Sequence, residues 1–137
     1  MKKLLSIFCA AAIAFCCMTH TVFAGDFEND GGISPYSLYT STNTSKLSIS
    51  SKRATCTSNV SAQSTSATIY ITQTFQKKSG STWTNISKSS KMFYSSSAEY
   101  TKTYSSISSG SYRMVTEATV YVSSKSEKTT SSDTASC

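Results

Sequence analysis

The sequence predicts an all-β protein, a single immunoglobulin-like Greek-key β-sandwich of about seven strands. After residue 24, serine and threonine supply 30 and 18 residues, whereas leucine occurs only at Leu38 and Leu47, so the composition favours strands over helices. From Lys46 onward, short runs alternate between apolar and polar residues with a period of two, which is typical of antiparallel strands with one buried face. Glycine and serine turns separate these runs, as they do in a sandwich.

The N-terminal residues have the three parts of a secretory signal peptide. Lys2 and Lys3 form a positive segment, and residues 4–18 are apolar. Val22 and Ala24 occupy the two positions where a signal peptidase reads small residues, so cleavage is expected before Gly25. The apolar stretch is shorter than the roughly 20 residues that span a bilayer. We therefore expect a secreted, extracellular protein with no stable membrane insertion.

The remaining chain is expected to divide into a lead-in and one domain. A flexible lead-in over residues 25–44 follows the signal peptide of residues 1–24, and a β-sandwich domain covers residues 45–137. The lead-in begins with acidic residues and contains most of the residues that break regular structure. These are Gly25, Gly31, Gly32 and Pro35.

The first predicted strands are short and polar, with small core faces. Leu47 and Ile49 share one face of the first strand, and the second strand follows over residues 53–62. The third strand, over residues 67–78, alternates most regularly and is expected to be central in its sheet. Its inward residues are expected to be Ile69, Ile71 and Phe75, and its outward residues Tyr70, Thr72, Thr74 and Gln76.

The later strands follow a tight hairpin at Ser79-Gly80, where glycine supplies the positive φ that the turn requires. Tyr112 comes just after the turn at residues 108–110, as a tyrosine corner would, although an ordinary core tyrosine explains it equally well. The predicted strands cover residues 81–88, 91–94, 98–104 and 111–122, and residues 125–130 are at most an edge strand.

Two stretches carry a resemblance to a known group of proteins. The stretch ATCTSNVSAQSTSATIYITQTFQKKSGSTWTNISK, followed by SSISSGSYRMVTEATVYV, resembles small secreted proteins of Gram-positive, clostridia-type bacteria that have no assigned function. The likeness lies in the QKKSGSTW hairpin and the SGSYR turn and covers about residues 45 to 130. It implies bacterial secretion and the same strands and turns, but no catalytic site. The terminal cysteine departs from the pattern of this group.

Two cysteines remain after the signal peptide, Cys56 and Cys137. An even pair in an oxidising compartment predicts one structural disulfide. Because the bond would close a long loop, it would stabilise the fold by about 4 kcal/mol. Two free thiols or a bridge between two chains are the alternatives.

The residue inventory argues against an enzyme. His20 is the only histidine and lies in the signal peptide, which excludes serine–histidine triads, cysteine–histidine pairs and histidine metal sites from the mature chain. No serine stands three positions before a lysine, and no phosphate loop, Cys-x-x-Cys pair or calcium loop occurs. We expect no catalytic residues, no cofactor and no metal. A hydrolase would need paired carboxylates from among Glu99, Glu117, Glu127, Asp133 and the acidic residues of the lead-in, of which only Glu117 lies inside a clear strand. Glu117 is more simply a charge on an outward strand face.

The positive charge suggests a class of partner. After Gly31 the chain has 11 lysines and arginines against 4 acidic residues, an excess that favours anionic partners such as a wall polymer. Alternatively, the lysines protect strand edges from pairing with other chains. No run of basic residues exceeds two, so nucleic acid is not an expected partner.

Outward aromatic residues complete the predicted binding surface. Tyr70 and Tyr121, with Lys77 and Lys78, are the candidate binding residues for an anionic wall polymer, a glycan or a protein. The alternative is that the rings only stabilise the sheet by cross-strand pairing. The sequence thus predicts a secreted, non-enzymatic binding or interaction domain at the cell envelope or extracellular matrix. A small secreted antagonistic peptide or toxin is the second hypothesis, and a hydrolase is the third.

Overall fold

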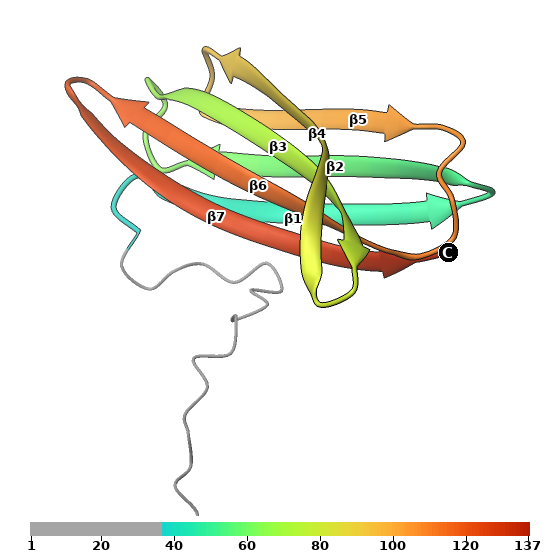
Figure 1. Cartoon of the computed structure of the whole chain (residues 1–137). Coiled ribbons are helices and arrows are strands. Elements are labelled where there is room, and N and C mark those ends of the chain that lie inside the picture. The colour runs from blue at the N-terminus through green and yellow to red at the C-terminus, as the bar shows by residue number, and fades with distance from the viewer. Residues whose placement is uncertain (1–36) are drawn as a thin grey trace, which may run out of the picture.

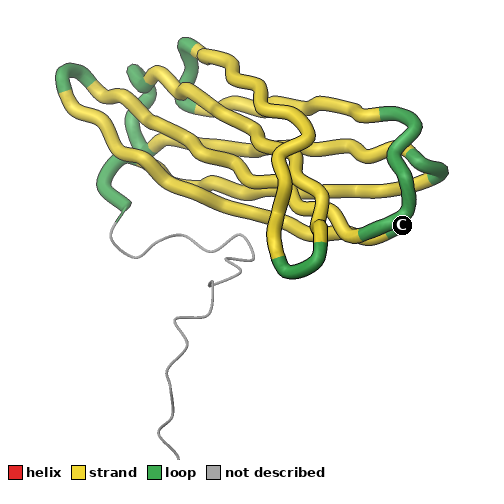
Figure 2. The backbone as a smooth tube through the Cα atoms, viewed as in Figure 1, coloured by secondary structure: helices red, strands yellow, loops and turns green. Residues whose placement is uncertain are grey.

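The computed structural model describes residues 37–137, which form two β-sheets packed face to face (Figure 1). The three-stranded sheet has the order β1-β2-β5, with β1 at Thr40–Ser50, β2 at Arg53–Ala62 and β5 at Ser97–Tyr104. The four-stranded sheet has the order β4-β3-β6-β7, with β4 at Thr82–Phe93, β3 at Thr68–Ser79, β6 at Ser111–Val122 and β7 at Lys125–Ser136. All strand pairs are antiparallel, and loops join them (Figure 2). The prediction of an all-β sandwich is confirmed.

The N-terminal boundary of the domain differs from the expected one. The predicted signal peptide and residues 25–36 of the predicted lead-in lie outside the described residues. Residues 40–44 do not belong to a lead-in, because they form the first half of β1 and pair with β2. The sequence did not predict this half of β1 because its buried side chains, Thr40 and Asn43, are polar.

The predicted inward apolar residues of β3 and β6 are confirmed, but Thr72 and Thr74 of β3, which were predicted to face outward, are buried as well. Ile69, Ile71 and Phe75 of β3 are buried, and β3 lies between β4 and β6 as a central strand. In β6, every second residue from Tyr112 to Val120 is buried, and the strand has the predicted bounds. Apolar side chains at alternate positions thus turn the same face of each strand toward the opposite sheet.

The two short strands predicted over residues 81–88 and 91–94 are one strand, β4. Phe75 pairs with Ser87, whereas Gln76 pairs with Asn85, so Ile86 is an extra residue at this register shift. A bulge of this kind moves the alternation by one position, which makes a continuous strand look like two. In addition, β4 is an edge strand with no buried residue and therefore no regular apolar face.

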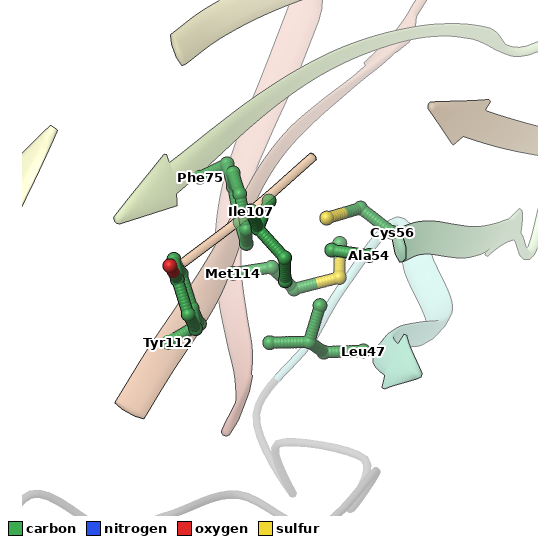
Figure 3. Close-up of a cluster of buried hydrophobic side chains, with 7 residues drawn as sticks. All are labelled: Leu47, Ala54, Cys56, Phe75, Ile107, Tyr112 and Met114. Carbon is green, nitrogen blue, oxygen red and sulfur yellow. The ribbon is translucent and has the colours of Figure 1, made fainter. Parts of the chain in front are cut away.

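The core consists of two hydrophobic clusters. One contains Leu47, Ala54, Cys56, Phe75, Ile107, Tyr112 and Met114 (Figure 3). The other, toward the opposite end of the sheets, contains Val60, Ala67, Ile69, Ile71, Ala98, Ala118 and Val120. Both clusters draw side chains from both sheets, so each one holds the two layers together.

The predicted disulfide is not formed, because Cys56 and Cys137 are free thiols in this structure. Cys56 points from β2 into the first cluster, and burial raises the pKa of its thiol to about 12 (Figure 3). Cys137 follows the last strand and is exposed, with its Sγ 3.3 Å from the carbonyl oxygen of Ser108. A buried core thiol and an exposed terminal thiol occupy different environments, although their even number predicted that they would pair.

A layer of polar side chains separates the two clusters and runs through both sheets. The Thr116 hydroxyl lies 2.7 Å from Ser45 Oγ and 2.6 Å from Ser58 Oγ. Ser45 Oγ is 2.8 Å from Ser131 Oγ, and Gln73 Nε2 donates to Ser58 Oγ at 2.8 Å. We call these five residues the polar belt. Buried hydroxyl and amide groups are tolerated in a core when they bond to one another in this way.

Carboxylates of β7 bind the backbone of β1 and the residues before it. Asp133 Oδ2 accepts the amide N–H of Leu47 at 2.7 Å. The Glu127 carboxylate accepts the amides of Leu38, Tyr39 and Thr40 and the hydroxyl of Ser37, at 2.8–3.0 Å. These bonds occupy amides on the free edge of β1, which would otherwise be open to pairing with another chain.

Candidate binding site at the loop end

The predicted binding residues do not lie together. Alternation along β3 places Tyr70 and Lys78 on the outer face of the four-stranded sheet and Lys77 on the inner face. Tyr121 of β6 shares the outer face and lies diagonally opposite Tyr70, because Tyr70 pairs with Thr119. Along an extended strand, Lys78 is about 26 Å from Tyr70. The tyrosines and Lys78 therefore lie toward opposite ends of one face.

Basic residues gather at one end of the sandwich, which we call the loop end. It comprises the β1–β2 turn, the β3–β4 hairpin, the β5–β6 loop and the C-terminus (Figure 1). A backbone bond of 3.0 Å from Ile107 N to Lys52 O joins the β1–β2 turn to the β5–β6 loop. Reciprocal backbone bonds between Gly110 and Cys137 join that loop to the C-terminus. The basic residues of the loop end are Lys52, Arg53, Lys77, Lys78 and Arg113.

A hollow lies on the loop end between the β3–β4 hairpin and the last residues of β7. It has a volume of about 440 Å³ and is lined by Lys78, Trp83, Ser111 and residues 134–136, and we call it the Trp83 hollow. The aromatic ring, the ammonium group and the hydroxyls form a mixed surface. A sugar fits such a surface, because its apolar face stacks on an aromatic ring while its hydroxyls exchange hydrogen bonds with polar side chains.

Two cations hold the Trp83 ring in place. The guanidinium carbon of Arg113 lies 4.6 Å from the ring centre, and Lys78 Nζ lies 5.9 Å from it. Arg113 Nε also donates to Gln76 Oε1 at 2.8 Å, and Gln76 Nε2 donates to Asn85 Oδ1 at 2.7 Å. Side chains that are already ordered lose little conformational entropy when a ligand binds. The cations also favour a ligand that carries negative charge.

Lys77 has a different position and braces the β5–β6 loop. Its Nζ donates to Ser108 Oγ at 2.5 Å and lies 5.6 Å from the centre of the Tyr112 ring. A Cβ atom on Gly110 would lie 3.1 Å from Lys77 Cε, and Gly110 has a φ of +144°, which L side chains rarely adopt. Glycine at this position thus lets the lysine stem pass close to the loop.

Trp83 and Arg113 were not among the predicted site residues. They are distant in the sequence and come together because β3 pairs with β4 on one side and with β6 on the other, so that Lys78 lies opposite Trp83 and Gln76 lies opposite Arg113. A signal that could have identified this region is the single tryptophan of the chain, which lies across a glycine hairpin from two consecutive lysines.

Other kinds of site are not evident in the described part of the chain. Among residues 37–137, no three His, Cys, Asp or Glu side chains gather as they would around a metal ion. No helix in this region has the length and apolar character needed to cross a membrane. Comparisons of the sequence and structure with protein-family models, curated proteins and solved structures found no match.

Proposed function

We propose that the protein is a secreted, non-enzymatic binding domain that acts at the cell envelope or extracellular matrix. The Trp83 hollow carries this proposal, because it joins an aromatic ring, ordered cations and hydroxyls at one site. Aromatic residues and arginine are the side chains that most often dominate binding energy at protein surfaces. The signal-like N-terminus supports secretion.

The proposed ligand is a glycan or an anionic wall polymer. Without the predicted signal peptide, the chain has 11 lysines and arginines against 7 acidic residues, and the loop end concentrates basic residues around the hollow. Such a distribution attracts a polyanion at long range, while stacking and hydrogen bonds hold it at short range. The exposed hydroxyls of Thr134 and Ser136 supply neutral partners for a sugar.

We also infer that the sandwich is an immunoglobulin-like Greek key. In immunoglobulin lettering, the observed strand order corresponds to the sheets ABE and DCFG, so the fourth strand has moved to the opposite sheet from that of a constant-type domain. Tyr112 supports this inference. It lies near the start of the sixth strand, and its hydroxyl donates to the carbonyl oxygen of Ser108 at 2.6 Å, as in a tyrosine corner. In domains of this class, recognition loops cluster at the ends of the sandwich.

The proposal can be tested by wall binding. Purified protein is incubated with isolated Gram-positive cell walls over a series of salt concentrations, and the bound fraction is measured. Trp83→Ala is expected to lower retention at all salt concentrations, because it removes a stacking surface. Lys78→Gln is expected to lower retention mainly below about 0.1 M salt, where screening is weak. The fluorescence of Trp83, the single tryptophan, should change when soluble wall fragments are added.

Matched variants separate this site from the predicted tyrosines. Lys88→Gln removes an exposed lysine of β4 from outside the hollow and should leave retention unchanged. Tyr70→Ala with Tyr121→Ala tests the other end of the same sheet face. Retention that depends on the tyrosines and not on Trp83 would overturn the assignment to the hollow. Absence of wall binding together with growth inhibition of neighbouring bacteria would favour the antagonistic peptide instead.

A further inference from the structure

A second hollow lies on the loop end, between the β1–β2 turn and the β5–β6 loop. It has a volume of about 640 Å³ and is lined by residues 51–53 and 105–108. Lys52 and Arg53 provide its charge, and serine hydroxyls make up most of the remaining polar lining. None of the described residues that line it is acidic. A concave surface with cations, hydroxyl donors and no carboxylate is suited to an anion.

The walls of this hollow are held in place by the protein. Ser51, Lys52 and Ser106 have φ values of 48°, 60° and 60°, which residues other than glycine adopt only where the surrounding structure compels them. The bond from Ile107 N to Lys52 O ties one wall to the other, and the Ile107 side chain anchors the loop in the first hydrophobic cluster. The backbone therefore presents the hollow before any ligand binds.

The end of the β5–β6 loop is braced independently. Ser108 is held by three side chains, since Lys77 Nζ donates to its hydroxyl, and Tyr112 Oη and Cys137 Sγ bond to its carbonyl oxygen. Lys77 also places a third positive charge next to the lining residue Ser108. Ser108 is therefore already ordered before a ligand binds, which lowers the entropic cost of using it in the site.

We propose that this hollow binds a phosphate group of a phosphodiester-linked wall polymer. Arginine offers a planar fork that matches two phosphate oxygens, lysine adds a compact charge, and serine hydroxyls donate to the remaining oxygens. The volume exceeds that of one phosphate, which leaves room for the polyol or sugar to which the phosphate is esterified. This inference rests on the proposed function, because it names the charged part of the same ligand.

The second hollow is close enough to the Trp83 hollow for one polymer to reach both. Ser108 lines the phosphate-binding hollow and Ser111 lines the Trp83 hollow, and their Cα atoms are at most about 11 Å apart, the fully extended length of three residues. A polymer that alternates phosphates with sugars or polyols would place a phosphate in one hollow and a neutral unit in the other. Occupying two sites with one chain raises the overall affinity.

The test combines a small phosphate ester with intact and stripped walls. Glycerol 3-phosphate is titrated into the purified protein, and the shifts of backbone amide NMR signals are followed; those of residues 51–53 and 105–108 should respond. The double variant Lys52→Gln, Arg53→Gln should bind about tenfold more weakly, since it removes two charge-assisted hydrogen-bond donors. The control Lys88→Gln, Lys125→Gln removes the same charge from exposed positions outside the hollow and should bind as the wild type does.

Cell walls then identify the polymer. Walls from which phosphodiester-linked polymers have been removed should retain less wild-type protein than intact walls, and the double variant should lose this difference. The inference would be overturned if the double variant and its control bound glycerol 3-phosphate equally well. It would also be overturned if single-stranded DNA bound at this hollow as tightly as the wall polymer does. Equal retention on stripped and intact walls, still dependent on Trp83, would overturn the phosphate site and leave the proposed function standing. Binding of glycerol phosphate without retention on walls would support the phosphate site and overturn the proposed function.

Discussion

Two tyrosines of the core stack on the same phenylalanine but differ at their hydroxyl groups. The ring centres of Tyr104 and Tyr112 lie 4.5 Å and 5.3 Å from that of Phe75, with nearly parallel planes. The Tyr112 hydroxyl donates to the carbonyl oxygen of Ser108, whereas the Tyr104 hydroxyl is buried without a partner in the described part of the chain. The contribution of each hydroxyl to stability therefore depends on whether a hydrogen-bond acceptor lies within its reach, and not on the residue type.

This difference predicts opposite effects of the same substitution. Tyr112→Phe should lower the free energy of unfolding by about 1 kcal/mol, because it removes a satisfied hydrogen bond and leaves the Ser108 carbonyl with a weaker set of partners. Tyr104→Phe should leave the free energy of unfolding unchanged or raise it, because it removes a buried polar group that has no partner. Urea denaturation of the two variants measures both values. Equal losses in the two variants would contradict the assigned hydrogen bond.

At the scale of the strands, the polar belt makes neighbouring residues of one strand differ in role. β6 carries Met114 and Ala118 into the two hydrophobic clusters and Thr116 into the belt between them. In β3, Gln73 belongs to the polar belt. Its Nε2 donates to Ser58 Oγ and, at 2.6 Å, to the carbonyl oxygen of Tyr100. A serine-rich and threonine-rich chain can thus build a sandwich, because its buried hydroxyls bond across the two sheets.

The belt predicts that an apolar substitution of the same shape destabilises the core. Thr116→Val keeps the volume but leaves the hydroxyls of Ser45 and Ser58 with one partner fewer, at a cost of about 1 to 2 kcal/mol. Thr119→Val, on the outer face of the same strand, should change stability by less than about 0.5 kcal/mol. Thermal and urea unfolding of the pair give the comparison. A Thr116→Val protein as stable as its Thr119→Val control would show that the belt does not stabilise the fold.

For the molecule as a whole, Glu127 ties the chain that enters the domain to its last strand. Partial burial raises the pKa of this carboxyl group, but hydrogen bonds from the amides of Leu38, Tyr39 and Thr40 and from Ser37 outweigh it and lower the pKa to about 2. The folded state thus favours the ionised form more than the unfolded state does. The resulting stabilisation is fully present above the ordinary pKa of 4.5 and is lost as the pH falls toward 2.

Acid unfolding should therefore depend on Glu127. Between about pH 4.5 and pH 2, the wild type should lose stability as this carboxylate takes up a proton. Glu127→Gln should be less stable at pH 7, because an amide accepts fewer and weaker hydrogen bonds than a carboxylate, and its stability should fall less steeply over the same range. Urea denaturation at a series of pH values tests this.

Glu99→Gln is the matched control. Glu99 is exposed on β5, so its replacement should leave the pH dependence as it is in the wild type. If Glu127→Gln and Glu99→Gln give the same pH dependence, the Glu127 carboxylate does not hold the entering chain.

The fold class and most strands could be read from the sequence alone, because alternation is a local property. The buried apolar positions of β3 and β6 could be predicted, since side chains two residues apart share one face of a strand. The burial of Thr72 and Thr74 could not, because the polar side of β3 is covered by neighbouring side chains. The first half of β1 could not be predicted because its buried residues are polar, and the continuity of β4 could not because a bulge interrupts the alternation. The disulfide prediction was wrong because the number of cysteines does not show in which direction each thiol points.

Where the binding groups meet depends on the arrangement of the strands in space. Lys77 and Lys78 are consecutive, but Lys77 binds Ser108 of the β5–β6 loop while Lys78 lies near the Trp83 ring, and neither neighbour could be predicted from the sequence. Trp83 and Arg113 looked unrelated, yet the register of three neighbouring strands brings the guanidinium over the ring. A site at the end of a sandwich is made of turns that are far apart in the chain, so its composition depends on strand order and register, which arise from packing between sheets and are not encoded in any short stretch of sequence.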